Sequence, residues 1–160
     1  MSQQTLEIIA GKLLRQRGWR LAVAESCTGG LVGHRLTNVA GSSTYYMGSI
    51  TAYAYEAKVR LLGIKWRSLE RYGAVSKQIA LEMALGVRRA LAADIGLSVT
   101  GIAGPGGGTP DKPVGYTWIG LSTGVYQDAR QFTWDQDRIG NKVLSADATI
   151  QMLVDYLQSL

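Results

Sequence analysis

Short apolar runs that end in turns of small residues alternate along this chain with segments whose apolar residues recur every three or four positions. One such run, Arg20 to Glu25, leads into Thr28-Gly29-Gly30, and another, Gly96 to Ala103, leads into a second glycine-rich segment. A period of three to four is typical of an amphipathic helix, and a short continuous apolar run is typical of a buried strand. Their alternation predicts an α/β fold, a three-layer α/β/α sandwich.

The same patterns predict the individual elements. Helices are expected near residues 6–17, 31–39, 56–62, 77–91 and 143–157, and strands near 20–25, 45–55, 96–103, 114–122 and 126–133. The last two strands are joined by Thr123-Gly124-Val125, a short connection that is typical of a hairpin. Because hairpin strands are antiparallel and strands that alternate with helices are usually parallel, we expect a mixed, mostly parallel sheet.

The length of 160 residues suits one domain with a substantial apolar core, and no linker, repeat or low-complexity tract divides it. We therefore expect a single domain over residues 1–160. One cysteine, Cys27, cannot form an intramolecular disulfide, and with one histidine, His34, it cannot supply four structural zinc ligands. We expect no metal and no cofactor. A single imidazole also disfavours Ser-His-Asp and Cys-His centres, so an enzyme of this sequence needs another base.

The formal net charge is +5, but the cationic residues are spread along the chain without a run of like charge. This distribution argues against a nucleic-acid surface and is compatible with anionic small molecules. The first residues lack a basic segment followed by an apolar one, and no stretch approaches about 18 uncharged apolar residues. We therefore expect a cytoplasmic protein without nucleic-acid or membrane partners.

The segment Glu25-Ser26-Cys27-Thr28-Gly29-Gly30 lies at the carboxyl end of a predicted strand and at the start of a predicted helix. In an open α/β sheet, ligands bind outside the carboxyl ends of the strands. The N–H groups at a helix start can stabilise an alkoxide or a tetrahedral oxyanion that forms there. An alternative interpretation is that Ser26 or Thr28 only caps the helix.

A second candidate segment begins with Thr100 and Gly101 and continues from Gly104 to Gly108. It matches neither the P-loop nor the dinucleotide-binding fingerprint. Its successive N–H groups could form an anion-binding nest or part of an oxyanion hole, or the segment could be an ordinary surface loop. Two glycine-rich turns that follow two separate strands could line one crevice.

Lys58 and Tyr53 lie between a predicted strand and the following helix. A lysine at a helix start is usually solvated, but burial or nearby cations can lower its pKa enough for it to act as a base. His34 is another possible base. On the predicted helix, however, it lies about 10 Å or more from the Ser26 turn, which is too far for direct proton transfer.

Several further motifs follow one another over nearly the whole chain, in residues 24–30, 40–43, 53 with 56–58, 73–76, 98–105 and 112–115. In this order they resemble the CinA C-terminal domain family, in its stand-alone nicotinamide-nucleotide amidase (PncC-like) form. The resemblance implies hydrolysis of the carboxamide of nicotinamide mononucleotide to nicotinate mononucleotide and ammonia. It also implies that no metal is needed, that a pyridine nucleotide is the small-molecule partner and that the protein forms a homo-oligomer.

Carried onto this chain, the resemblance implies that Ser26 is the nucleophile, that Lys58 is the general base and that Tyr53 supports them. The residues expected near the substrate are Thr28, Gly29, Gly30, Ser42, Ser43, Thr100, Gly101 and Gly104. The chain departs from the family pattern at Ala54-Tyr55, and at Gln136 and Gly140, where arginines are usual. These departures leave a second hypothesis, a catalytically silent paralogue that binds nucleotides or regulates a partner.

Overall fold

A computed structural model describes residues 4–160 and contains one five-stranded sheet in the order β2-β1-β3-β4-β5. The strands are β1 (Leu21–Glu25), β2 (Tyr46–Thr51), β3 (Ile95–Gly101), β4 (Tyr116–Ser122) and β5 (Gln127–Thr133). The helices are α1 (Leu6–Arg17), α2 (Leu31–Thr37), α3 (Tyr55–Leu62), α4 (Trp66–Tyr72), α5 (Lys77–Ala90) and α6 (Arg138–Gln158), with a 3-10 turn, η1 (Ser42–Thr44). None of these helices combines the length and the apolar character needed to cross a membrane.

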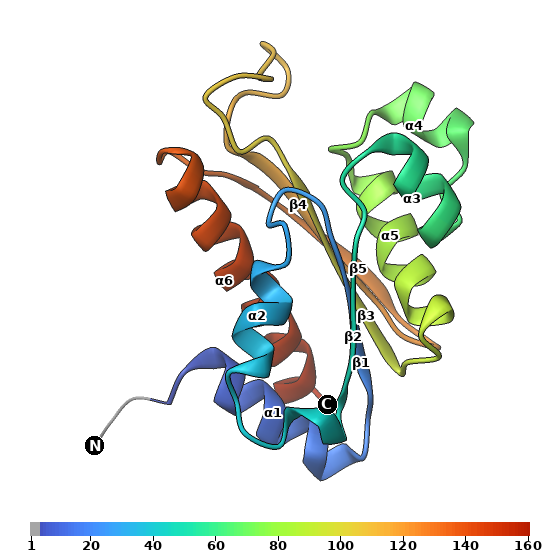
Figure 1. The fold of residues 1–160 in the computed structure, drawn as a ribbon, viewed down its shortest axis with the longest axis vertical. Helices are drawn as coiled ribbons and strands as arrows, with labels where there is room; N and C mark the ends of the chain where they lie inside the picture. The colour runs from blue at the N-terminus through green and yellow to red at the C-terminus, as the bar shows by residue number, and fades with distance from the viewer. Residues whose placement is uncertain (1–3) are drawn as a thin grey trace.

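Two layers of helices enclose the sheet (Figure 1). On one face, α1, α2 and α6 pack against apolar side chains of β1, β3 and β4, including Val23, Leu97 and Ile119. On the other face, α3, α4 and α5 pack against Ala22 and Ala24 of β1. Because β1 is covered on both faces, all five of its residues are buried, as is typical of a central strand in an α/β fold.

The sheet is mixed, as the sequence predicts. Strand β1 is parallel to β2 and to β3, whereas β3 with β4 and β4 with β5 are antiparallel pairs. Four of the five strands therefore run in one direction. In register, Glu25 pairs with Thr51 on one side and with Val99 on the other. The carboxyl ends of β1, β2 and β3 thus meet at one edge of the sheet, toward the top of Figure 1.

The predicted fold class is confirmed, but three element predictions need correction. The sequence pattern does not predict helix α4, because its two turns are too short to show a period. The strand expected over 45–55 ends at Thr51, and Tyr55 is already the first residue of α3. The last helix begins at Arg138, five residues before Val143, because Asp137 caps it by accepting a hydrogen bond from Gly140 N at 2.7 Å.

Candidate active site

Ser26 is the first residue after β1, and hydrogen bonds to β3 and to the residue that follows β2 fix the chain at this point. The Ser26 N–H donates to Val99 O of β3 at 3.0 Å, and the preceding residue, Glu25, accepts at its carbonyl oxygen a hydrogen bond from Ala52 N at 2.9 Å. Gly29 and Gly30 then turn the chain toward α2 with φ angles of 61° and 104°. Residues with a side chain rarely adopt such angles. The turn therefore presents the largely buried Ser26 hydroxyl at the carboxyl edge of the sheet.

Lys58 enters the site from the first turns of α3 and is 1% exposed. Its Nζ atom donates hydrogen bonds to three oxygens, Ser26 Oγ at 2.9 Å, Ala52 O at 2.8 Å and Tyr53 O at 2.9 Å. The alternative of a solvated surface lysine is therefore wrong. Two main-chain carbonyl groups aim the amine at the serine hydroxyl.

The surroundings of Lys58 favour its neutral form. Burial lowers the pKa of the Lys58 amine to about 8, because removal from water disfavours the charged form. Among residues 4–160, no carboxylate forms an ion pair with Lys58 that would oppose this effect. A lysine with a pKa near 8 can accept a proton near neutral pH.

Cys27 lies beside Ser26 but is in a different chemical state. Burial raises the pKa of the Cys27 thiol to about 12, and the nearby Glu25 charge acts in the same direction. The thiolate is the nucleophilic form of cysteine, so at neutral pH this side chain is unreactive. Of these two adjacent side chains, only the Ser26 hydroxyl is hydrogen-bonded to the Lys58 amine.

The alternative role of Ser26 or Thr28 as the cap of α2 is wrong, because neither side chain accepts a hydrogen bond from the helix. The Glu25 carboxylate accepts those bonds instead, from Val32 N at 2.9 Å and Gly33 N at 3.1 Å. Glu25 is not among the predicted site residues. A charged residue at the end of an apolar strand is the one signal in the sequence that points to it, because buried charges are rare.

The second glycine-rich segment reaches the site through Arg138 at the start of α6. Arg138 Nη1 donates to Gly104 O at 2.7 Å, and Nη2 donates to Tyr53 Oη at 3.2 Å. The Tyr53 side chain is 61% exposed, and its hydroxyl is bonded to Arg138. Tyr53 contacts Lys58 through its carbonyl oxygen. Beside this contact, a surface hollow of about 480 Å³ is lined by Gly104, Val114, Arg138 and neighbouring residues.

Gly101, at the end of β3, closely faces the Ser26 turn. A Cβ atom built on it would lie 3.2 Å from Cys27 Sγ. The neighbouring Thr100 hydroxyl donates to Ala74 O at 2.8 Å and is buried. A Cβ atom built on Gly29 would lie 3.8 Å from Lys142 Nζ of α6. The structure thus adds a cationic group, Lys142, to the edge of the Ser26 turn.

Two of the predicted substrate-binding residues are not brought to this edge. Ser42 and Ser43 lie in η1, just before β2 begins, and Tyr46 at that end of β2 pairs with Leu21 at the start of β1. Since the two strands are parallel, a residue that precedes β2 lies at the opposite edge of the sheet from Ser26. His34 is exposed on α2, with its Nε2 atom 3.5 Å from Asn38 Nδ2, so it does not serve Ser26 as a base.

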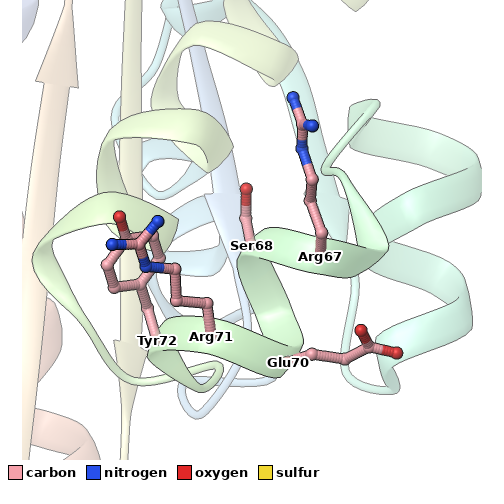
Figure 2. Close-up of a pocket in the computed structure, with 5 residues that line it drawn as sticks. All are labelled: Arg67, Ser68, Glu70, Arg71 and Tyr72. Carbon is pink, nitrogen blue, oxygen red and sulfur yellow. The ribbon is translucent and has the colours of Figure 1, made fainter.

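A separate hollow of about 600 Å³ lies on α4 and is lined by Arg67, Ser68, Glu70, Arg71 and Tyr72 (Figure 2). The Arg71 guanidinium lies 5.2 Å from the centre of the Tyr72 ring. None of the predicted site residues lines this hollow. Within residues 4–160 there is also no group of three or more histidine, cysteine or acidic side chains that could hold a metal ion.

The fold and the site define an α/β domain with a buried serine-lysine pair at the carboxyl edge of its sheet. The profile of the CinA C-terminal domain family matches residues 3–157, and the chain belongs to this family. A CinA-like protein of Salinibacter ruber is 51% identical over 92% of this chain and 36% of its own length. A putative competence-damage inducible protein of Halothermothrix orenii is 47% identical, again over 92% of this chain and 36% of its own. The chain thus spans about a third of these relatives.

Solved structures agree with this assignment over the full domain. The competence/damage inducible protein CihA of Agrobacterium tumefaciens superposes with a TM-score of 0.90 at 33% identity and covers 99% of both chains. A competence-damaged protein (CinA) superfamily protein of Klebsiella pneumoniae gives a TM-score of 0.91 at 27% identity, over 98% of this chain and 100% of its own.

Proposed function

We propose that this domain is an amidohydrolase that converts nicotinamide mononucleotide and water into nicotinate mononucleotide and ammonia. The observation that carries the proposal is the 2.9 Å contact between Lys58 Nζ and Ser26 Oγ, made by a lysine with a lowered pKa. A nucleophile and a base within hydrogen-bond reach, with the base itself oriented by other groups, are typical of acyl-transfer enzymes. The resemblance to nicotinamide-nucleotide amidases supplies the substrate.

The three hydrogen bonds of Lys58 support its role as the base. A neutral amine has two N–H groups and one lone pair. If the two carbonyl groups, Ala52 O and Tyr53 O, accept the two N–H groups, the lone pair faces the Ser26 hydroxyl. Ser26 then donates its proton to Lys58 as Oγ attacks the carboxamide carbon.

The remaining steps return every group to its starting state. The tetrahedral intermediate breaks its C–N bond, and the proton on Lys58 goes to the nitrogen, which leaves as ammonia. The product is an ester of Ser26. Lys58 then takes a proton from water, the hydroxide attacks the ester carbon, and Ser26 recovers its proton from Lys58 as nicotinate mononucleotide leaves.

The oxyanion of the tetrahedral intermediate needs donors close to Ser26. In the described part of the chain, the N–H groups of Cys27, Thr28 and Gly30 donate to no other residue, whereas Gly29 N is used by Ser26 O at 3.2 Å. We assign the three uncommitted N–H groups, with Gly101 close by, to the oxyanion site. Within the Thr28-Gly29-Gly30 turn, the oxyanion role therefore falls to Thr28 N and Gly30 N and not to Gly29 N.

Two cations at the same edge suit a phosphate group. Lys142 lies beside Gly29, and Arg138 bridges Gly104 and Tyr53. They lie on the first turns of α6, near Gln136 and Gly140, where the family usually has arginines. We propose that these two residues supply the missing positive charge.

The homo-oligomer and the cytoplasmic location remain predictions.

The proposal is tested by incubating the purified protein with nicotinamide mononucleotide and measuring ammonia and nicotinate mononucleotide. We expect equal amounts of both products, and none from Ser26→Ala. Nicotinamide riboside lacks the phosphate. Its KM should be at least about tenfold higher, because at least one charged contact to the phosphate is lost. Nucleotide binding by folded protein without turnover would contradict the proposal and favour the silent paralogue.

A further inference from the structure

Glu25 is an acidic residue that is completely buried directly before the proposed nucleophile. Its carboxylate accepts three hydrogen bonds. Oε1 accepts from Thr28 Oγ1 at 2.6 Å and from Val32 N at 2.9 Å, and Oε2 accepts from Gly33 N at 3.1 Å. A buried carboxylate is tolerated where such donors replace water. These donors lie on the Ser26 turn and on the first turn of α2.

Helix α2 packs closely against the surroundings of the carboxylate at Gly33. A Cβ atom built on Gly33 would lie 3.4 Å from Glu25 Oε2, 2.5 Å from Tyr46 Oη and 2.8 Å from Ser49 Oγ. The two hydroxyl groups, Tyr46 Oη and Ser49 Oγ, are themselves hydrogen-bonded to each other. A side chain at position 33 would clash with these two hydroxyl groups, so the glycine lets α2 pack against Tyr46 and Ser49 beside the Glu25 carboxylate.

Because Glu25 caps α2, the start of this helix is not available to a substrate anion. Val32 N and Gly33 N are occupied, and the carboxylate charge offsets the positive end of the helix dipole. The Thr28 hydroxyl hydrogen is also directed at Glu25. The uncommitted donors that remain near Ser26 are the N–H groups of the turn itself.

The main chain of Glu25 connects the nucleophile to the base. Its carbonyl oxygen accepts from Ala52 N at 2.9 Å, and Ala52 O in turn accepts from Lys58 Nζ at 2.8 Å. The side chain of the same residue fixes the turn that follows Ser26. Glu25 therefore contacts both segments whose relative placement sets the distance between Ser26 Oγ and Lys58 Nζ.

We propose that Glu25 is a positioning residue for the reaction: its buried carboxylate holds the Ser26 turn against α2 so that Ser26 faces Lys58 and the N–H groups of Cys27, Thr28 and Gly30 face the reacting carbonyl. This inference deepens the proposed function and rests on it. The contribution is geometric, because removal of the Glu25 charge alone would make the surroundings of Ser26 more positive and would favour an alkoxide there.

The experiment measures how fast Ser26 reacts with a fluorophosphonate, a probe that phosphonylates activated serines without needing a nucleotide site. Wild type is compared with Glu25→Gln, which keeps size and removes one acceptor oxygen. Glu70→Gln is the matched control, because Glu70 is exposed on α4 and makes none of the hydrogen bonds or ion pairs found in the described chain. Melting temperatures are recorded for each protein, and all rates are measured well below them.

We expect Glu25→Gln to lower the second-order rate of Ser26 labelling by about 10- to 100-fold per folded molecule, because a displacement on the order of 1 Å is enough for such a loss. Glu70→Gln should stay within about twofold of wild type. With nicotinamide mononucleotide, the loss should fall on kcat rather than on KM. A role in stability alone would lower the melting temperature and leave the labelling rate of folded protein unchanged, and that result would overturn the inference.

A second variant keeps the test decisive if Glu25→Gln does not fold. Thr28→Val removes one of the two donors to Glu25 Oε1, the Thr28 hydroxyl, and leaves Val32 N in place. It should lower Ser26 labelling in the same direction, by about threefold to tenfold. An unchanged rate in folded Thr28→Val would overturn the inference. If wild type is labelled at Ser26 but does not hydrolyse the nucleotide, the proposed substrate fails while the labelling comparison still decides the role of Glu25. If wild type is not labelled, Ser26 is not an activated nucleophile and the inference falls with it.

Discussion

The two glycine-rich segments at the carboxyl edge of the sheet are built in different ways. In the turn 26–30, Ser26, Cys27 and Thr28 are buried, and the buried residues Glu25 and Lys58 hold the turn from two sides. In the segment 104–113, Gly104 is buried but residues 105–111 are exposed. One hydrogen bond fixes this segment at each end: Arg138 of α6 donates to Gly104 O, and Lys112 of the segment donates to Tyr72 O of α4 at 2.6 Å.

This difference in packing suits the two segments to different tasks, the reaction in the buried turn and substrate recognition in the exposed segment. Reacting atoms must be held within a fraction of an ångström, which requires packed neighbours and satisfied hydrogen bonds. A loop that contacts the outer part of a substrate can be exposed and can adjust as the ligand binds. In the proposed enzyme, the buried turn performs the reaction, and the exposed segment shapes the entrance together with Arg138.

The largest expected effect contrasts Lys58, which holds the buried turn, with Lys112 of the exposed segment. Lys58→Met removes the proposed base and should lower kcat for nicotinamide mononucleotide on the order of 10³-fold. Lys112→Met removes an amine of the same size from the exposed segment. It should lower kcat/KM by at most about tenfold, because a single hydrogen bond to the Tyr72 carbonyl is lost.

Both variants are assayed by ammonia release after their folding has been checked by circular dichroism. Comparable losses in the two variants would mean that the exposed segment takes part in the chemistry. Near-normal turnover in Lys58→Met would remove Lys58 from the mechanism.

A smaller effect contrasts one glycine from each segment. Gly30 has a φ of 104°, so Gly30→Ala should reduce the free energy of unfolding by about 1 to 2 kcal/mol. A Cβ atom on Gly106 would meet nothing within 4 Å, and its φ lies outside the positive range. Gly106→Ala should therefore change stability little, or raise it by about 0.5 kcal/mol. Urea unfolding measures both values, and equal destabilisation would contradict the contrast.

The sequence predicts the placement of Ser26 well, because a turn after an apolar strand lies at the carboxyl edge of an α/β sheet. It does not predict the environment of Lys58. The position of the lysine at the start of a helix is local information, whereas its burial depends on how α3 packs beside β1 and β2. The proposed role of Lys58 as the base comes from the resemblance to the family, because the spacing of residues along the chain does not indicate it.

Ser42-Ser43 and Lys142 illustrate the limits of local patterns in opposite ways. The Ser42-Ser43 turn is as small and polar as the turn at Ser26, but it precedes a strand and therefore lies at the opposite edge. Lys142 belongs to a helix far along the chain, and no motif links it to Gly29. Only the packing of α6 beside α2, in the same layer of helices, brings the two together.

The most direct test of the serine-lysine pair is the pH dependence of Ser26 phosphonylation in wild-type protein between pH 6 and pH 10. Burial lowers the pKa of Lys58 to about 8, so Lys58 is protonated and inactive as a base below that pH and neutral above it. The rate should therefore rise with pH, pass its midpoint near pH 8 and then level off. A midpoint close to the ordinary lysine value of 10.5, or a rate that does not change with pH, would contradict the assignment of Lys58 as the base for Ser26.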